Sequence, residues 1–410
     1  MLLWPPLHAE DGTEMLAYYY CHREPSSILR AYNGYVSLLP NLIGYSSLGA
    51  PIALAPRLLA AAPFALTVAC LMLPFSVRLF GRDVSPGARA APTLLLAALP
   101  LGTANLVANT TYSLWNCLLA LALLSLAPPA AGWLGTLGRL ALAIPLLASH
   151  PLSLVVLPVF AATARRDRPG AAAALALILL GLTYQLAGVA RPELDSRIGA
   201  VDLGLLAVRY LAERVVFTSL FGGELRVALH ESGLGPAVTV IGLLVIAAVS
   251  ALCFREWRRG GVRRWQQAGL AYLVGAFTLV TVSTRVTQGR WLGSFFGERY
   301  FYVPKVLFLL LLISLGLAAW SRSSPRRRRL IGAAVCAYAA LLGYVERDRY
   351  AVDVAAGRRI AAFVDQAATL ESRNAGRRGI DTVLVRERGE PIRLLAPPEN
   401  VPCEEAASPQ

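Results

Sequence analysis

The residues best suited to acid-base chemistry lie near the amino terminus, where Glu10 and Asp11 are adjacent and Gly12 follows them. Neighbouring carboxylates repel each other, so such a pair can hold one proton, remove a proton from a substrate or coordinate a cation. The tyrosines at 18–20 favour the membrane–water interface. Two interpretations follow: a general base held at a membrane surface, or the solvated turn that an acidic pair in a loop commonly forms.

Basic residues near predicted helix ends are the second group of candidates. Arginine has a planar guanidinium that binds phosphate through two parallel hydrogen bonds and keeps its charge at physiological pH. A basic side chain at a helix end also commonly extends to lipid headgroups without binding a substrate. The candidates for phosphate contact are Arg57, Arg299 with its neighbour Tyr300, and Lys305; those for lining the same cleft are His150 and Asn109.

The composition identifies the elements that must position these side chains. Of the 410 residues, 56% are hydrophobic and only 16% are charged, which is far from the average of soluble domains. Disordered chains are poor in apolar residues, so disorder is excluded as well. Long Leu, Ala and Val runs without alternation favour helices over a β-barrel. We predict an all-α polytopic membrane protein, and its net charge of +14 does not indicate a nucleic-acid partner.

A helix needs about 20 apolar residues to cross the hydrocarbon core of a bilayer. The predicted crossings between 136 and 164 are short and contain Pro145, Pro151 and Pro158. Broken helices of this kind are tolerated where they line a cavity within the protein. The sequence predicts about ten crossings in all, at 57–77, 91–107, 110–127, 136–149, 151–164, 171–190, 236–254, 267–284, 301–320 and 330–346.

Arginine clusters set the orientation, because short cytoplasmic loops are enriched in basic residues. With these crossings, four clusters fall on one side, around 78–89, 165–168, 255–264 and 322–329. We therefore divide the chain into an outer loop with the acidic pair (1–56), a transmembrane domain (57–346) and an outer polar tail (347–410). Within the transmembrane domain, the long outer loop 191–235 mixes apolar and charged residues in a pattern typical of an amphipathic interfacial helix.

The predicted outer position of residues 1–56 requires that the amino terminus crosses the membrane. The segment 1–11 lacks the basic region and long apolar stretch of a signal peptide. We expect that a first transmembrane helix is missing from this version of the chain; unaided translocation of the amino terminus is the alternative.

The order of these motifs resembles the GT-C superfamily of integral-membrane glycosyltransferases. The similar segments are the ED-G of the first outer loop, the aromatic stretch and GY segment after it, the PR at 56–57, NLVANTTYSLW at 105–115, His150-Pro151, and GERYFYVP at 297–304. The resemblance implies a GT-C-like arrangement of helices, with Asp11 as the catalytic base and Glu10 as its partner.

Members of this superfamily transfer a sugar from a polyprenyl-phosphate carrier to an acceptor at the outer face of the membrane. The resemblance therefore implies a polyprenyl-phosphate-linked sugar donor, an acceptor of unidentified class and membrane lipid as partners, in the plasma membrane of a bacterium. Arg57, Arg299 and Lys305 would bind the leaving phosphate. Some members hold a divalent metal at the acidic motif; the adjacent pair here allows a metal without requiring one.

Two other functions are compatible with a polytopic protein that has outer arginines. One is a transporter or flippase of lipid-linked glycans, although the sequence places few charges inside predicted helices and contains no evident internal repeat. The other is a polymerase or ligase of surface polysaccharide. Such proteins usually carry their key arginines in a large outer loop late in the chain, whereas the acidic cluster here is early.

Overall fold

The computed structural model is helical through most of the part it describes, in agreement with the predicted fold class. The described residues are 15, 18–32, 35–50, 54–76, 96, 109–127, 132–164, 199–260, 264–285, 292–294, 297–345, 384–387 and 390–393. The acidic pair Glu10 and Asp11 lies outside them, as do the predicted crossing 171–190 and all but one residue of 91–107.

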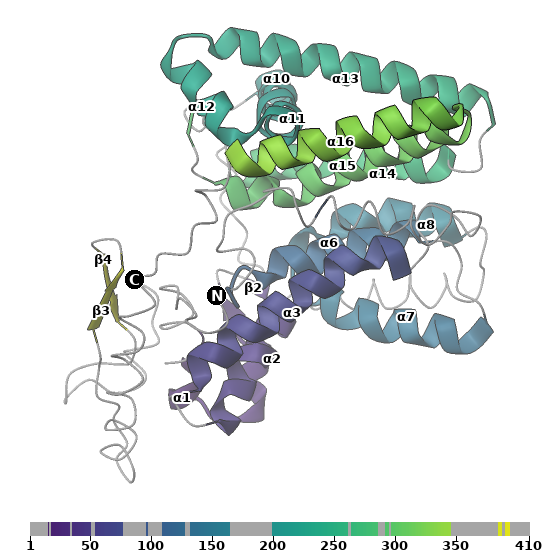
Figure 1. Cartoon of the computed structure of the whole chain (residues 1–410). Helices are drawn as coiled ribbons and strands as arrows, with labels where there is room; N and C mark the ends of the chain where they lie inside the picture. Colours follow the sequence, from purple (N-terminus) through teal and green to yellow (C-terminus); the bar gives the residue numbers. More distant parts are fainter. Residues whose placement is uncertain are drawn as a thin grey trace.

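The first half of the chain forms the lower layer in Figure 1. Its longest helix, α3, packs against the buried helix α6. The elements are α1 (Tyr18–Cys21), η2 (Pro25–Leu29), β1 (Ala31–Tyr32), β2 (Tyr35–Val36), α2 (Leu38–Ser46), η3 (Ser47–Gly49), α3 (Ala55–Ser76), α6 (Ser113–Leu126), α7 (Gly132–Leu147), η4 (Pro151–Val156) and α8 (Leu157–Ala164).

The second half forms the upper layer, and a short hairpin near the carboxyl terminus lies to one side (Figure 1). The helices are α10 (Ala200–Tyr210), the π-helix η5 (Leu211–Phe217), α11 (Thr218–Phe221), α12 (Gly223–Glu231), α13 (Gly235–Arg258), α14 (Arg264–Arg285), η7 (Glu298–Phe301), α15 (Tyr302–Ser321) and α16 (Pro325–Val345). The hairpin pairs β3 (Leu384–Glu387) with β4 (Glu390–Arg393) in antiparallel register.

Five helices in the described part are long and apolar enough to cross a membrane. Predicted crossings coincide with all five, at Arg57–Pro74, Gly235–Arg258, Arg264–Thr284, Glu298–Trp320 and Pro325–Val345. The predicted crossings 110–127, 136–149 and 151–164 correspond to shorter apolar helices, Ser113–Leu126, Leu134–Leu147 and Pro151–Ala162. These helices indicate a membrane protein.

The two layers meet where α6 packs against α14 and α15. Every residue of α6 is buried, as expected for a helix that is apolar on all sides and central in its bundle. Its one amide side chain is bonded on both sides: Asn116 donates to the Thr67 hydroxyl of α3 (2.8 Å) and accepts from the Tyr302 hydroxyl of α15 (3.2 Å). These hydrogen bonds connect α3, α6 and α15. They also satisfy an amide that would be costly to bury unpaired in an apolar interior.

The helix break predicted around Pro151 is confirmed. Helix α7 ends at Leu147, and the 3₁₀-helix η4 begins at Pro151 before α8 continues. Helix α2 occupies the break: the Leu39 amide donates to the Ser149 hydroxyl (3.0 Å), and the Leu38 amide donates to the Ala148 carbonyl (3.2 Å). The break therefore seats the amino-terminal helices against α7.

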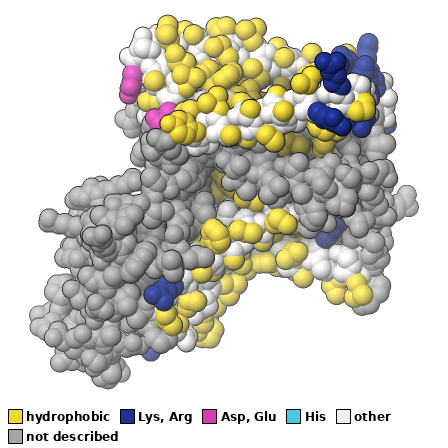
Figure 2. Space-filling model, in the orientation of Figure 1, with side chains coloured by type: hydrophobic (Ala, Val, Ile, Leu, Met, Phe, Trp, Pro, Cys, Tyr) yellow, Lys and Arg dark blue, Asp and Glu magenta, His cyan; other side chains and the backbone are white. Residues whose placement is uncertain are grey.

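Charged side chains on the visible face of the upper layer lie near the two ends of the helices. The dark blue basic side chains gather at one end in Figure 2, and acidic side chains lie at the other. Glu256 of α13 is bonded to Arg322 after α15 (2.6 Å), so the two adjoining turns lie at the same end, as the topology predicts. We call this surface the arginine-rich end: Arg255, Arg258, Arg259, Arg264, Arg322, Arg326, Arg327, Arg328 and Arg329. The clusters around 78–89 and 165–168 lie outside the described residues.

The long loop after 191 differs from the single interfacial helix that the sequence predicts. Only α10 has the expected exposed apolar stripe, with Val201, Leu205 and Val208 accessible. The next seven residues form the π-helix η5, whose residues from Ala212 onward are all buried. Helix α13 lies so close to η5 that a Cβ atom at Gly242 would be 2.4 Å from the Ala212 carbonyl oxygen. The absence of a side chain at Gly242 permits this packing, which removes η5 from the surface.

Candidate functional site

The segment 297–301 positions the two predicted site residues Arg299 and Tyr300. Gly297 adopts a left-handed conformation (φ 72°), which favours glycine, and the 3₁₀-helix η7 starts directly after it. Helix α15 continues from η7 toward the arginine-rich end. Arg299 and Tyr300 therefore lie at the opposite end of the bundle, which the topology predicts to be outer.

The half-buried guanidinium of Arg299 lies between two tyrosine rings. It donates hydrogen bonds to the hydroxyl oxygens of Tyr112 and Tyr300, the latter at 3.2 Å. The guanidinium carbon is 4.5 Å from the ring centroid of Tyr112 and 5.1 Å from that of Tyr300. Cation–π contact and hydrogen bonds together fix the plane of the guanidinium, as recognition of a phosphate group requires.

An aromatic cluster adjoins Arg299 and includes the predicted residue His150. The ring centroid of Trp115 is 5.5 Å from that of Tyr300 and 4.8 Å from that of His150, and Tyr35 is 5.6 Å from His150 on another side. His150 also caps η4, because its Nδ1 accepts a hydrogen bond from the Leu152 amide (3.0 Å). The broken helix thus fixes this imidazole among aromatic rings.

Asn109 joins the same group of residues through Tyr112. Its Oδ1 accepts a hydrogen bond from the Tyr112 amide (2.8 Å) just before α6 begins. The side chain is fully buried, and its Nδ2 has no hydrogen-bond partner among the described residues. A buried amide donor is costly when unpaired, so this NH₂ group is suited to donate to a ligand.

The two remaining predicted residues lie apart from this group. Arg57 is exposed on the first turn of α3, near the point where the Leu59 carbonyl accepts from the Thr110 hydroxyl (2.6 Å). Lys305 is buried on α15, where its ammonium group pairs with the Glu298 carboxylate. The structure therefore brings together Asn109, His150, Arg299 and Tyr300, but directs Lys305 into a separate ion cluster.

This ion cluster is centred on Glu298, and we call it the Glu298 cluster: Glu298, Lys305, Arg214 and Arg226. The Glu298 carboxylate lies 3.0 Å from Arg226 and 3.3 Å from Arg214, and all four side chains are buried. Both arginines also donate to backbone carbonyls of the segment 292–294. The cluster thus anchors the segment 292–294, which precedes η7 in the chain.

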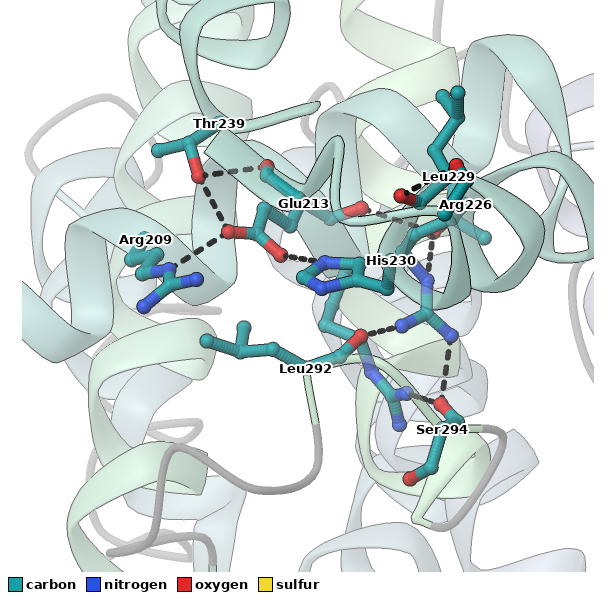
Figure 3. Close-up of polar contacts among 12 residues, drawn as sticks. Arg209, Glu213, Arg226, Leu229, His230, Thr239, Leu292 and Ser294 are labelled. Atoms are coloured by element: carbon teal, nitrogen blue, oxygen red, sulfur yellow. Dashed lines mark hydrogen bonds and ion pairs between the residues drawn. The ribbon is translucent and has the colours of Figure 1, made fainter. Parts of the chain in front are cut away.

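A second buried carboxylate, Glu213, lies beside the Glu298 cluster (Figure 3). It accepts from Arg209 (2.8 Å) and Thr239 (2.5 Å), and the His230 Nε2 is 2.7 Å away. Gly293 packs directly on the His230 imidazole, where a Cβ atom would be 3.2 Å from the His230 Cβ. Glu213 and His230 therefore support the segment 292–294 beside Arg226, which contacts the same segment from the same helix α12.

The two carboxylates and an aromatic stack fix η5 against η7. The rings of Tyr210 and Phe301 are stacked with centroids 5.4 Å apart, and the Arg214 guanidinium lies 5.2 Å from the Phe301 centroid. Burial raises the pKa of Tyr210 to about 12, so its hydroxyl stays neutral at physiological pH. The part of the long loop that includes Tyr210 and Arg214 therefore packs against η7 and stabilises its position.

Sequence reasoning missed the supporting residues but had a signal for some of them. Glu298 is part of the GERYFYVP motif, directly before the predicted site residues Arg299 and Tyr300. Glu213 and Arg214 interrupt an apolar stretch, a sign of buried charge that also fits an amphipathic helix. No local pattern marks His230, because its partner Glu213 is 17 residues away in the chain.

The described residues do not include the acidic pair of the predicted site, which allows a bound metal. Glu10 and Asp11 lie outside the described residues, so their placement relative to Arg299 stays a prediction. Within the described ranges, no group of three or more His, Cys, Asp or Glu side chains could hold a metal ion. No family model, curated protein or solved structure matches this chain.

Proposed function

We propose that the protein is a GT-C-like membrane glycosyltransferase with about ten transmembrane helices, which moves a sugar from a polyprenyl-phosphate carrier to an acceptor at the outer face. The observation that carries the proposal is the setting of Arg299. Its guanidinium is held in a fixed plane between Tyr112 and Tyr300, beside Trp115 and His150. This group lies at the end of the bundle away from the arginine-rich end.

The chemistry of a lipid-phosphate leaving group matches these residues. As the bond between the sugar and the phosphate breaks, the phosphate oxygen keeps the electron pair and gains negative charge. A guanidinium held in position stabilises that charge in the transition state without moving. The NH₂ group of Asn109 is suited to donate to the same anion, and the aromatic rings of Trp115 and Tyr300 offer apolar faces to the sugar.

The acceptor hydroxyl requires a base, for which Asp11 is the candidate and Glu10 its partner. The carboxylate takes the hydroxyl proton as the acceptor oxygen forms its bond to the anomeric carbon. The tyrosines that follow the pair favour the same membrane interface as the outer helix ends. Arg57, exposed at the start of α3, is a further candidate for contact with the phosphate of the lipid carrier.

The proposal is tested on the full chain in proteoliposomes supplied with radiolabelled polyprenyl-phosphate hexoses and pentoses and a mixture of lipid and glycan acceptors. Asp11→Asn is expected to lower transfer by about 10²–10⁴-fold, the usual contribution of a general base. Arg299→Lys is expected to lower it by about 10–100-fold, because lysine cannot form the two-point contact.

Matched controls are Asp202→Asn on the exposed first turn of α10 and Arg259→Lys at the arginine-rich end, both expected to retain transfer. Full activity of Asp11→Asn overturns the assignment of the base. Translocation of the labelled lipid by the wild type without any sugar transfer overturns the enzyme in favour of a flippase.

A further inference from the structure

We infer that the arginine-rich end binds the headgroups of anionic phospholipids, which is a function separate from sugar transfer. Its arginines come from two neighbouring turns, one between α13 and α14 and one between α15 and α16. Figure 2 shows the basic side chains gathered there as one surface. Four helices begin or end at this surface, and all four, α13, α14, α15 and α16, are long and apolar enough to cross a membrane.

The positive charge of this surface exceeds what its own carboxylate can neutralise. Among the described residues 250–260, 264–275 and 315–335, Glu256 is the single acidic residue. Arg322 binds it through both terminal guanidinium nitrogens, Nη1 (3.0 Å) and Nη2 (2.6 Å), and Arg259 binds it at 3.1 Å. The neighbouring Arg255, Arg258, Arg326, Arg327 and Arg329 are exposed, so the surface keeps a large net positive charge.

Two tryptophans place this charge at the depth of lipid headgroups. Trp257 and Trp265 are both exposed, and their rings meet edge to face with centroids 5.0 Å apart. The Arg264 guanidinium lies 5.6 Å from the Trp257 centroid and 6.0 Å from that of Trp265. Tryptophan favours the boundary between headgroups and acyl chains, so the guanidinium groups beside it reach the phosphates.

Guanidinium groups at this depth recognise the phosphodiester of an anionic lipid. Arginine matches phosphate geometry with two parallel hydrogen bonds, and basic clusters next to a transmembrane helix attract anionic lipids. Each arginine near such a surface strengthens binding by about fivefold, so several neighbouring arginines give a strong preference over zwitterionic lipid. The Glu256–Arg322 bridge keeps the two turns adjacent, which allows one headgroup to contact both.

The test is a titration of the full chain, purified in neutral detergent, with dansyl-labelled phosphatidylglycerol or dansyl-labelled phosphatidylcholine, read by energy transfer from tryptophan. We expect phosphatidylglycerol to bind at least about tenfold more tightly, with the difference shrinking at high salt. The combined variant Arg326→Gln, Arg327→Gln and Arg329→Gln is expected to lose at least about tenfold in affinity for phosphatidylglycerol.

The matched control changes the same three arginines to lysine and is expected to bind more tightly than the glutamine variant, because lysine keeps the charge although it loses the two-point contact. If the glutamine variant fails to fold, Arg255→Gln with Arg258→Gln on α13 replaces it. Equal affinity of the wild type for the two lipids overturns the inference, as does unchanged binding in a folded glutamine variant.

Discussion

Glu298 and Arg299 are consecutive residues of η7 whose side chains enter different clusters. The Glu298 carboxylate is buried against Arg214, Arg226 and Lys305, whereas the Arg299 guanidinium is half-buried between Tyr112 and Tyr300. One short turn therefore links the support of the site to the group that we propose to contact phosphate. The predictions below separate these two roles.

The first prediction concerns the Glu298 cluster. Glu298→Gln removes the carboxylate that faces three buried cations, and breaking a buried ion pair in this way costs about 3–5 kcal/mol. We expect a clear fall in the free energy of unfolding, measured by thermal denaturation in nanodiscs. Glu231→Gln, at an exposed position of α12, is the control and should unfold like wild type. Equal stability of the two variants would contradict the role of Glu298.

The second prediction concerns the hydrogen bond to Glu213. Thr239→Val keeps the shape of the side chain but removes the hydroxyl that donates to the buried carboxylate. Hydrogen bonds to charged groups contribute about 1.5–3 kcal/mol, and we expect a loss of that size. Ser232→Ala removes an exposed hydroxyl that donates to the Leu229 carbonyl, and serves as the comparison. A loss no larger than that of Ser232→Ala would show that Thr239 does not stabilise Glu213.

The third prediction concerns the contact between α13 and η5. Gly242→Ala would place a Cβ atom 2.4 Å from the Ala212 carbonyl oxygen, so the helices must separate. Overpacking of this kind typically costs about 1–3 kcal/mol. Gly275→Ala on α14, where no atom lies within 4 Å of the new Cβ, is expected to be neutral or stabilising by up to about 1 kcal/mol. Similar unfolding temperatures for the two variants would argue against the close approach.

The fourth prediction tests the orientation of Arg299 and rests on the proposed function. Tyr112→Phe removes the hydroxyl that accepts from the Arg299 guanidinium but keeps the ring beneath it. We expect sugar transfer to fall by about tenfold, because a less fixed guanidinium stabilises the leaving phosphate less well. The stability of the fold should change little. Tyr272→Phe, at an exposed position of α14, should leave transfer unchanged.

The outcome for Tyr112→Phe distinguishes positioning from packing. A variant that loses transfer and unfolds at the wild-type temperature supports a positioning role for the hydroxyl. Unchanged transfer would show that the hydrogen bond from Arg299 to Tyr112 has no part in the reaction.

Much of the fold follows from the sequence, because continuous apolar runs long enough to cross a bilayer allow few alternatives. The runs at 236–254 and 301–320 correspond to α13 and α15, and Pro151 marks the helix break as predicted. Composition and helix-breaking residues act locally, so these elements could be predicted.

The site was predictable only in part, because its contacts join residues far apart in the chain. Arg299, Tyr300, His150 and Asn109 were found from motifs at helix ends, and the structure brings them together. Lys305 was expected at the phosphate, but it pairs with Glu298. That pairing depends on the fold of η7 onto α15, which no local pattern specifies.

The separation of Arg226 from Glu298 by 72 residues has a consequence for biosynthesis. The arginine leaves the ribosome before the carboxylate that it meets in the folded protein, and before α13 and α14 are complete. A charged guanidinium is costly in hydrocarbon, so we expect η5 and α12 to stay in a hydrated environment until Glu298 has been synthesised. Docking of Arg226 against Glu298 therefore has to follow the synthesis of all 72 residues between them.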